Sequence, residues 1–366
     1  MRTTPVPFDK YTSFGNNFLI IDETANPLPG DSERASLARW LLDGAFGLGG
    51  TDNVLYLTRL DRNTAAGSVV ATENPATGAA DFEFRIFEHD GAETLSCGNG
   101  LLCTAAFLNA RYGHRNAVVL TEVPTGDPRP VRLGTGEREG TTWINVGEPR
   151  PAPAELFNRT EPPPSSRIDH VTGIEVPLPA EAAWAGSLPP VLPLSGYLTF
   201  TGEPHLALIS GHGLPEELEK VLFIEPGGQG PELIGRPPAP EVRATLALVD
   251  HLGRHVNDTY RHLFPQGVHL NFARRLPAGA VEYRTYERAI DRETLACGSG
   301  VIAMAFVLRA LGLTSGESTR FRPHRCRWFV PDAELVVTSG ADGWSLTGMP
   351  LLVAHGEARV PASVLR

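Results

Sequence analysis

Two stretches of the chain are nearly identical: Glu93-Thr94-Leu95-Ser96-Cys97-Gly98-Asn99-Gly100 and Glu293-Thr294-Leu295-Ala296-Cys297-Gly298-Ser299-Gly300. Six of the eight positions are the same, and the two cysteines lie 200 residues apart. The likeness extends upstream, where residues 83–88 match residues 282–287. A repeat this long is far beyond the period of a solenoid. It therefore predicts two homologous domains.

The residues around each cysteine predict the same local structure twice. The alternating stretch before each cysteine is typical of a strand. The Ala-rich apolar runs that follow, 101–110 and 301–310, are typical of helices. Each Cys-Gly-X-Gly turn should therefore open a helix, where the partial positive charge of the helix start attracts anions and lowers the pKa of a thiol.

The many short alternating runs elsewhere indicate a strand-rich α+β fold. We expect a first domain at residues 1–150 and a second at residues 196–344. The Pro-rich residues 151–195 between them are interpreted as a linker or insertion. We expect the last strand-like segment, about 345–366, to return to the first domain.

Composition narrows the class of protein. The chain has 366 residues and a formal net charge of −10, which argues against a nucleic-acid partner. It contains no apolar run long enough to span a membrane and no signal peptide, so a cytoplasmic location is expected. The four cysteines, Cys97, Cys103, Cys297 and Cys326, have the spacing of neither a disulfide scaffold nor a zinc site. We therefore expect reduced thiols, no metal and no cofactor. The sequence leaves open whether the protein is a homodimer.

Two thiols at two helix starts suit one kind of chemistry. Inverting the α-carbon of an amino acid requires a base on one face and an acid on the other, and a thiolate and a thiol can fill these roles. The two helix starts would stabilise the charge that develops on the α-carboxylate. The repeat around Cys97 and Cys297 therefore predicts a cofactor-independent amino-acid racemase or epimerase.

Six ordered motifs carry a resemblance to a known family. They are Phe14-Gly15-Asn16-Asn17-Phe18, Gly47 to Asn53, Asp90-Gly91 through Cys97-Gly98-Asn99-Gly100 to Cys103, Pro204-His205, Glu287-Arg288, and Glu293-Thr294 with Cys297-Gly298-Ser299-Gly300. With them the chain resembles the diaminopimelate epimerases and, more broadly, the cysteine-dependent, PLP-independent racemases. The resemblance implies two domains related by a pseudo-twofold axis, each a sheet wrapped around a central helix, with the active site in the cleft between them.

The resemblance also implies roles for single residues. Cys97 and Cys297 would be the acid and base, and His205 and Glu287 would tune them or shuttle protons. The backbone N–H groups of Gly98, Asn99, Gly298 and Ser299 would hold the α-carboxylate. Asn16 and Asn53 would order and line the site, and Arg288 would contact the far end of the substrate.

Three departures from the family bear on the substrate. Where diaminopimelate epimerases hold the distal end of the substrate with asparagines, this chain has Glu88, Glu203 and His269. Two carboxylates would repel a distal carboxylate and favour a cation. We therefore expect a basic or polar substrate such as histidine, arginine, ornithine, lysine or a modified relative. The alternatives are a diaminopimelate epimerase and a non-catalytic small-acid binding protein on the same fold.

Overall fold

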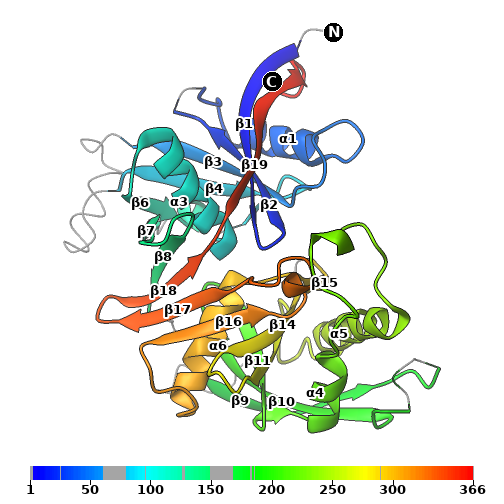
Figure 1. Ribbon diagram of the computed structural model, residues 1–366. Helices are drawn as coiled ribbons and strands as arrows, with labels where there is room; N and C mark the ends of the chain where they lie inside the picture. Colours follow the sequence, from blue (N-terminus) through cyan, green and yellow to red (C-terminus); the bar gives the residue numbers. More distant parts are fainter. Residues whose placement is uncertain are drawn as a thin grey trace. The chain divides into compact units, whose positions relative to one another are not determined.

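The computed structural model describes residues 3–24, 26–60, 80–94, 96–125, 128–148, 168–181, 184, 186–288 and 290–365 (Figure 1). The chain divides into two compact units. Unit 1 contains Met1–Gly147 together with Ser345–Arg366, and unit 2 contains Glu148–Trp344. The C-terminal segment thus belongs to unit 1.

Unit 1 is a sheet that encloses an apolar helix. Its strands are β1 (Thr3–Ser13), β2 (Asn16–Asp22), β3 (Asn53–Arg59), β4 (Phe82–Phe87), β5 (Glu93–Thr94), β6 (Asn116–Thr121), β7 (Arg129–Thr135), β8 (Thr142–Gly147) and β19 (Leu351–Pro361). Its helices are α1 (Asp31–Leu42), α3 (Gly98–Tyr112) and the short η1 (Val123–Thr125). Helix α3 contacts β1, β2, β6, β7 and β8.

Unit 2 has the same plan with additional helices. Its strands are β9 (Asp169–Pro177), β10 (Val191–Phe200), β11 (Pro204–Ser210), β12 (Gly213–Leu214), β13 (His269–Arg275), β14 (Val281–Glu287), β15 (Arg292–Thr294), β16 (Ser318–Pro323) and β17 (Leu335–Gly340), and β18 (Gly343–Gly348) crosses the boundary with unit 1. Its helices are α4 (Glu216–Leu222), α5 (Pro240–Thr259), α6 (Gly298–Ala310) and the short η3 (Pro231–Leu233) and η4 (Cys326–Trp328). Helix α6 contacts β10, β11, β13 and β17.

Strand pairing shows that the sequence repeat is a repeat of the fold. In unit 1 the chain of pairs β1–β2–β3–β4–β6–β7 alternates between antiparallel and parallel, starting antiparallel. In unit 2 the chain β10–β11–β13–β14–β16–β17 alternates in the same order. Helices α3 and α6 each bridge the second parallel step of their unit. Their cysteines therefore occupy equivalent places.

The outer partner of the first strand comes from a different part of the chain in each unit. In unit 2, β10 pairs antiparallel with β9, which precedes it in sequence. In unit 1, β1 pairs antiparallel with β19, the last strand of the chain. The predicted return of the C-terminus thus completes the sheet of unit 1.

The interpretation of residues 151–195 as a linker is wrong for its second half. Residues 169–177 and 191–195 lie in β9 and β10, and Ile174, Val176, Leu192 and Leu194 are buried in the core of unit 2. These residues alternate with a period of two, but the prolines around them obscured the pattern. Residues 149–167 lie outside the described part of the chain.

A buried ion pair fixes the approach to each cysteine. Arg284 on β14 donates to Glu293 on β15 at 2.6 Å from both Nε and Nη2, and both side chains are almost fully buried. In unit 1, Arg85 on β4 pairs with Glu93 on β5 in the same way. These residues occupy equivalent repeat positions, so each pair anchors the short strand that leads to the cysteine.

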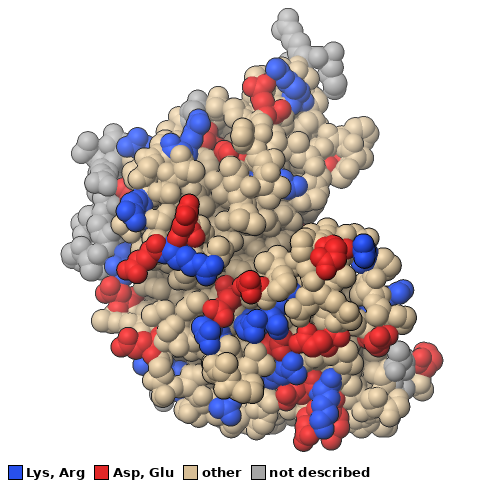
Figure 2. Space-filling view, in the orientation of Figure 1, with Lys and Arg blue, Asp and Glu red and all other residues tan. Residues whose placement is uncertain are grey.

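Within the described residues, no helix is long and apolar enough to cross a membrane. On the face shown in Figure 2, acidic and basic side chains are interspersed, and no continuous basic area appears there.

Candidate active site

Each of the two predicted thiols stands directly before a helix. Cys97 precedes α3 with an extended backbone at φ −147° and ψ 116°, and Cys297 precedes α6 at φ −122° and ψ 116°. The carbonyl of each accepts the first helical hydrogen bond, from Leu101 and Val301 respectively. The first-turn N–H groups have no carbonyl partner within the helix, and neither first turn contains an acidic residue. Both helix starts are therefore suited to a carboxylate.

In unit 1, a carboxylate fixes the side chain that faces Cys97. Asp52 Oδ2 accepts hydrogen bonds from Asn16 Nδ2 at 2.9 Å and from the backbone N–H of Asn17 at 2.7 Å. Because a carboxylate only accepts, Asn16 must turn its oxygen the other way. Asn16 Oδ1 lies 3.9 Å from Cys97 Sγ and 3.4 Å from Asn99 Nδ2. The structure thus brings the predicted residues Asn16, Asn99 and Cys97 together.

In unit 2, a chain of hydrogen bonds ends at Cys297. Its Sγ lies 3.4 Å from Ser299 Oγ, which lies 3.1 Å from His205 Nε2. His205 Nδ1 lies 3.2 Å from Asn271 Nδ2, and Asn271 Oδ1 accepts from Thr285 Oγ1 at 3.1 Å. Burial, together with the nearby His269 and Arg288, holds the pKa of His205 well below its usual range, so the ring is neutral.

Three of the residues expected at the distal end of the substrate form a cluster in unit 2. Arg288 Nη2 donates to Glu203 Oε2 at 2.5 Å, and His269 Nε2 lies 3.7 Å from the same oxygen. The ring of His269 stacks on His205 with centroids 4.8 Å apart. Burial opposes ionisation of Glu203, but His269 and Arg288 outweigh it and hold the pKa of its carboxyl below the usual range.

This cluster alters the expected role of the Glu203 carboxylate. We expected a carboxylate open to a cationic substrate, but Glu203 is already paired with a cation of its own chain. Arg288 neutralises it because the two side chains meet from the start of β11 and the end of β14.

The remaining predicted residues lie at the ends of strands. Glu287 ends β14 and accepts a hydrogen bond from Thr294. Glu88 occupies the equivalent repeat position after β4, in a tight turn where its N–H donates to the carbonyl of Ala92. Asn53 begins β3 opposite Phe18, as His269 begins β13 opposite His205. Gly98 and Gly298 are the first residues of α3 and α6.

Sequence reasoning missed the residues that orient the site. Asp52 and Asn271 touch neither thiol, and each acts through a neighbour, Asn16 or His205. Asp52 lies in a glycine-rich motif that was noticed for its glycines, and Asn271 lies two residues beyond His269. A polar residue at an inward position of an apolar strand was the available signal for Asn271.

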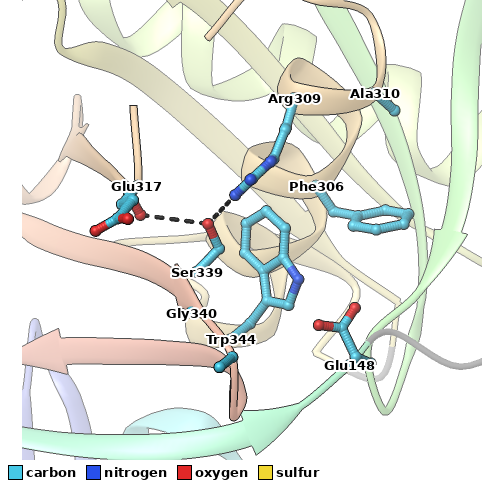
Figure 3. A pocket seen from close by; sticks show the side chains of 9 residues that line it. Glu148, Phe306, Arg309, Ala310, Glu317, Ser339, Gly340 and Trp344 are labelled. Carbon is cyan, nitrogen blue, oxygen red and sulfur yellow. Dashed lines mark hydrogen bonds between the residues drawn. The ribbon is translucent and has the colours of Figure 1, made fainter. Parts of the chain in front are cut away.

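A pocket lies at the far end of α6 (Figure 3). Arg309 donates to Ser339 there and lies over the ring of Trp344, 5.8 Å from its centroid. Arg309 is twelve residues beyond Cys297, which corresponds to about 18 Å along a helix. This pocket is therefore separate from the thiol.

Comparison with known proteins identifies relatives over most of the chain. No protein-family model matches the sequence. The diaminopimelate epimerase of Methanocella arvoryzae is 28% identical over 324 residues, which are 86% of each chain. The diaminopimelate epimerase of Gemmatimonas aurantiaca is 26% identical over 355 residues, which are 96% of each chain.

Solved structures agree on the fold. A hydroxyproline epimerase from Agrobacterium vitis, with trans-4-hydroxy-L-proline bound, superposes with a TM-score of 0.54 at 15% identity, covering 97% of this chain and 92% of that one. A phenazine biosynthesis protein of the PhzF family from Bacillus anthracis has a TM-score of 0.52 at 13% identity, covering 98% and 100%. At such identities the likeness concerns the fold alone. Over most of its length the chain is thus a homologue of diaminopimelate epimerases at 26–28% identity, and this likeness supports an isomerase of the amino-acid epimerase type.

Proposed function

We propose that the protein inverts the α-carbon of an amino acid with Cys97 and Cys297 as the acid and base. The observation that carries this proposal is the placement of a cysteine directly before the central helix of both repeat units. A buried cysteine is usually a small core residue. Two cysteines at equivalent helix starts, each with a polar side chain at its sulfur, are difficult to explain by packing alone.

This mechanism assigns one thiol to each face of the substrate α-carbon. One thiolate removes the α-proton, and the other thiol delivers a proton to the opposite face. The first-turn N–H groups of α3 and α6 hold the α-carboxylate and stabilise the charge that develops on it. His205 and Glu287 tune the pKa of the two thiols or shuttle protons to and from them.

Diaminopimelate is the first substrate to consider, because the relatives that match most of the chain are diaminopimelate epimerases. The pair formed by Glu203 and Arg288 supports it. A distal amino-acid group has one charge of each sign, so its ammonium could exchange onto Glu203 and its carboxylate onto Arg288. A substrate with only one distal charge would leave one member of the pair without a partner.

A basic amino acid is the second candidate. Glu88 and Glu203 stand where the family has neutral amides. Two carboxylates in place of amides favour a substrate with a positive distal end, such as histidine, arginine, ornithine or lysine.

The test is α-deuterium incorporation in heavy water with diaminopimelate and each basic amino acid. We expect one of these substrates to exchange, and we expect Cys97→Ala and Cys297→Ala each to lower its rate by about 10²-fold or more. Cys103→Ala is the matched control, since Cys103 is buried in α3 and burial holds the pKa of its thiol far above the usual range. A helix-start variant that exchanges as fast as the parent would refute the two-thiol mechanism.

A further inference from the structure

The two copies of the repeat differ at the residue two positions beyond each cysteine. Unit 1 has Asn99 and unit 2 has Ser299. Each of these side chains belongs to the hydrogen-bond network around its thiol. The helix starts are equivalent, so the helix dipole acts on both sulfurs alike. A difference between the thiols can therefore come from burial, which is greater for Cys297 than for Cys97, and from the side chains at each sulfur.

The side chain that faces Cys97 is an acceptor. Asp52 accepts a hydrogen bond from the side-chain amide N–H of Asn16, so Asn16 Oδ1 points toward the sulfur of Cys97. An oxygen acceptor can bond to a thiol S–H but repels a thiolate. A hydrogen bond to the neutral form of a group disfavours its ionisation. This contact favours Cys97 as the thiol.

The side chain that faces Cys297 is a donor. Asn271 Nδ2 donates to His205 Nδ1, so the proton of the neutral ring is on Nε2. That N–H donates to Ser299 Oγ, which leaves the hydroxyl hydrogen of Ser299 available to donate to Cys297 Sγ, the direction that we adopt. A hydrogen bond donated to the charged form of a group favours ionisation. This contact favours Cys297 as the thiolate.

We infer that the resting protein holds Cys297 as the thiolate and Cys97 as the thiol, with Ser299 and Asn16 as the positioning residues that set this difference. The inference deepens the proposed function and rests on it for its catalytic meaning.

The other titratable groups near the sulfurs are compatible with this assignment. Near Cys297, His205 on β11 is neutral, and Tyr283 on β14 stays neutral because burial raises the pKa of its phenol. Near Cys97, the buried thiol of Cys103 also stays neutral. Asp52 is the one carboxylate in the described network of Cys97, and it reaches the sulfur only through Asn16.

The assignment gives turnover a direction. Cys297 takes the α-proton and becomes a thiol, while Cys97 gives its proton to the opposite face of the substrate and becomes a thiolate. When the product leaves, the protein is in the opposite protonation state. One proton must then pass from Cys297 to Cys97 through solvent, or a molecule of the opposite configuration must be turned over.

The test measures the ionisation of each thiol separately, without substrate. The protein is alkylated with iodoacetamide at a series of pH values, and the peptides containing Cys97 and Cys297 are quantified by mass spectrometry. The thiolate displaces iodide, so the midpoint of each pH profile reports ionisation, whereas accessibility changes only the absolute rate. We expect a lower midpoint for Cys297 than for Cys97.

Two variants test the positioning residues with effects of opposite sign. Ser299→Ala should raise the Cys297 midpoint by about one pH unit and leave the Cys97 midpoint unchanged. Asn16→Ala should lower the Cys97 midpoint and leave Cys297 unchanged. Circular dichroism checks that both variants are folded, and in each the thiol of the other unit is the internal control.

Three results would overturn the inference. They are a parental Cys97 midpoint at or below that of Cys297, a Cys297 midpoint that falls in Ser299→Ala, and midpoints that neither variant moves. A fall would mean that Cys297 donates to Ser299. None of these results depends on turnover. They are therefore distinct from a failure of the proposed function, in which the cysteine variants would exchange the α-proton as fast as the parent.

Discussion

Gly100 and Gly300 occupy the same repeat position, three residues beyond each thiol, but their surroundings differ. A methyl group on Gly100 would meet Leu55 and Phe18 at 3.4 Å, which is ordinary contact. On Gly300 it would lie 2.5 Å from Asn271 Oδ1 and 3.3 Å from Cys297 Cβ. In unit 2 the missing side chain at Gly300 leaves room for Asn271, which contacts His205.

We therefore expect the same substitution to have unequal effects in the two units. Gly300→Ala must displace Asn271, so His205 loses the hydrogen bond that positions its ring. We expect this to lower α-deuterium exchange by about 10²-fold. Gly100→Ala should keep most of the activity, since its methyl group fits and alanine favours a helix. The comparison of exchange rates checks this. Equal losses in both variants would show that Asn271 does not position His205.

The residues that could be predicted were those that the chain repeats. Cys97 and Cys297 stand out because their whole context occurs twice. Asp52 could not be recognised, because its role depends on Asn16, 36 residues away, and no spacing records that contact. The Glu203–Arg288 pair joins residues 85 positions apart and was missed for the same reason.

At the scale of elements, β14 depends on a buried carboxylate. Glu282 is 1% exposed and accepts from Arg274 Nη2 at 2.6 Å and from Arg327 Nη1 at 2.6 Å, and it lies 3.0 Å from His324 Nδ1. Burial opposes its ionisation, but His324 and Arg274 outweigh burial and lower the pKa of Glu282 to about 2. This cluster joins β14 to β13 and to the turn after β16.

Because this pKa is depressed on folding, Glu282 stabilises the protein above its unfolded pKa of about 4.5 and loses that contribution as the pH falls toward 2. We expect Glu282→Gln to lower the free energy of unfolding at pH 7 by about 3 kcal/mol. The deficit should shrink between pH 4.5 and pH 2 in urea titrations. Glu216→Gln, which alters an exposed pair with Lys220, is the control and should change little. A deficit that is constant with pH would contradict the assignment.

Elements with one clear period were predictable from the sequence. The helices after Cys97 and Cys297 were expected at 101–110 and 301–310, and they extend over Gly98–Tyr112 and Gly298–Ala310. Strand β9 and the first part of β10 were not recognised, because Pro177 and Pro193 interrupt their apolar alternation. The side chain of Pro193 is exposed, while Leu192 and Leu194 point into the core.

At the scale of the molecule, unit 1 depends on the last strand of the chain. Ala358 on β19 is 5% exposed and lies opposite Val6 of β1, in the apolar cluster with Val360 and Leu37. Ala354 lies on the same strand but is exposed. The two alanines therefore allow the same substitution to be compared in two environments.

We expect Ala358→Asp to lower the free energy of unfolding of unit 1 by about 3 kcal/mol or more, because it places a charge among apolar side chains. Ala354→Asp should change it by less than about 0.5 kcal/mol. Hydrogen exchange by mass spectrometry can resolve the effect, since protection should fall in β1 and β2. Equal protection in both variants would mean that β19 does not hold the sheet of unit 1 together.

The repeat made the division into two homologous units predictable, but it could not show how each sheet is completed. The pairing of β1 with β19 joins residues 339 to 358 positions apart, and only the apolar alternation near the C-terminus hinted at it.

The origin of β19 has a consequence for the order of events during synthesis. A ribosome makes the residues of unit 2 as one continuous stretch, and every described strand that pairs with β10 is available once that stretch has emerged. The sheet of unit 1 must wait, with the outer edge of β1 uncovered, until β19, which follows unit 2 in the sequence, leaves the exit tunnel. The unit that is translated first is therefore the one that is finished last, and during this interval its exposed edge is where a nascent chain would need protection from association.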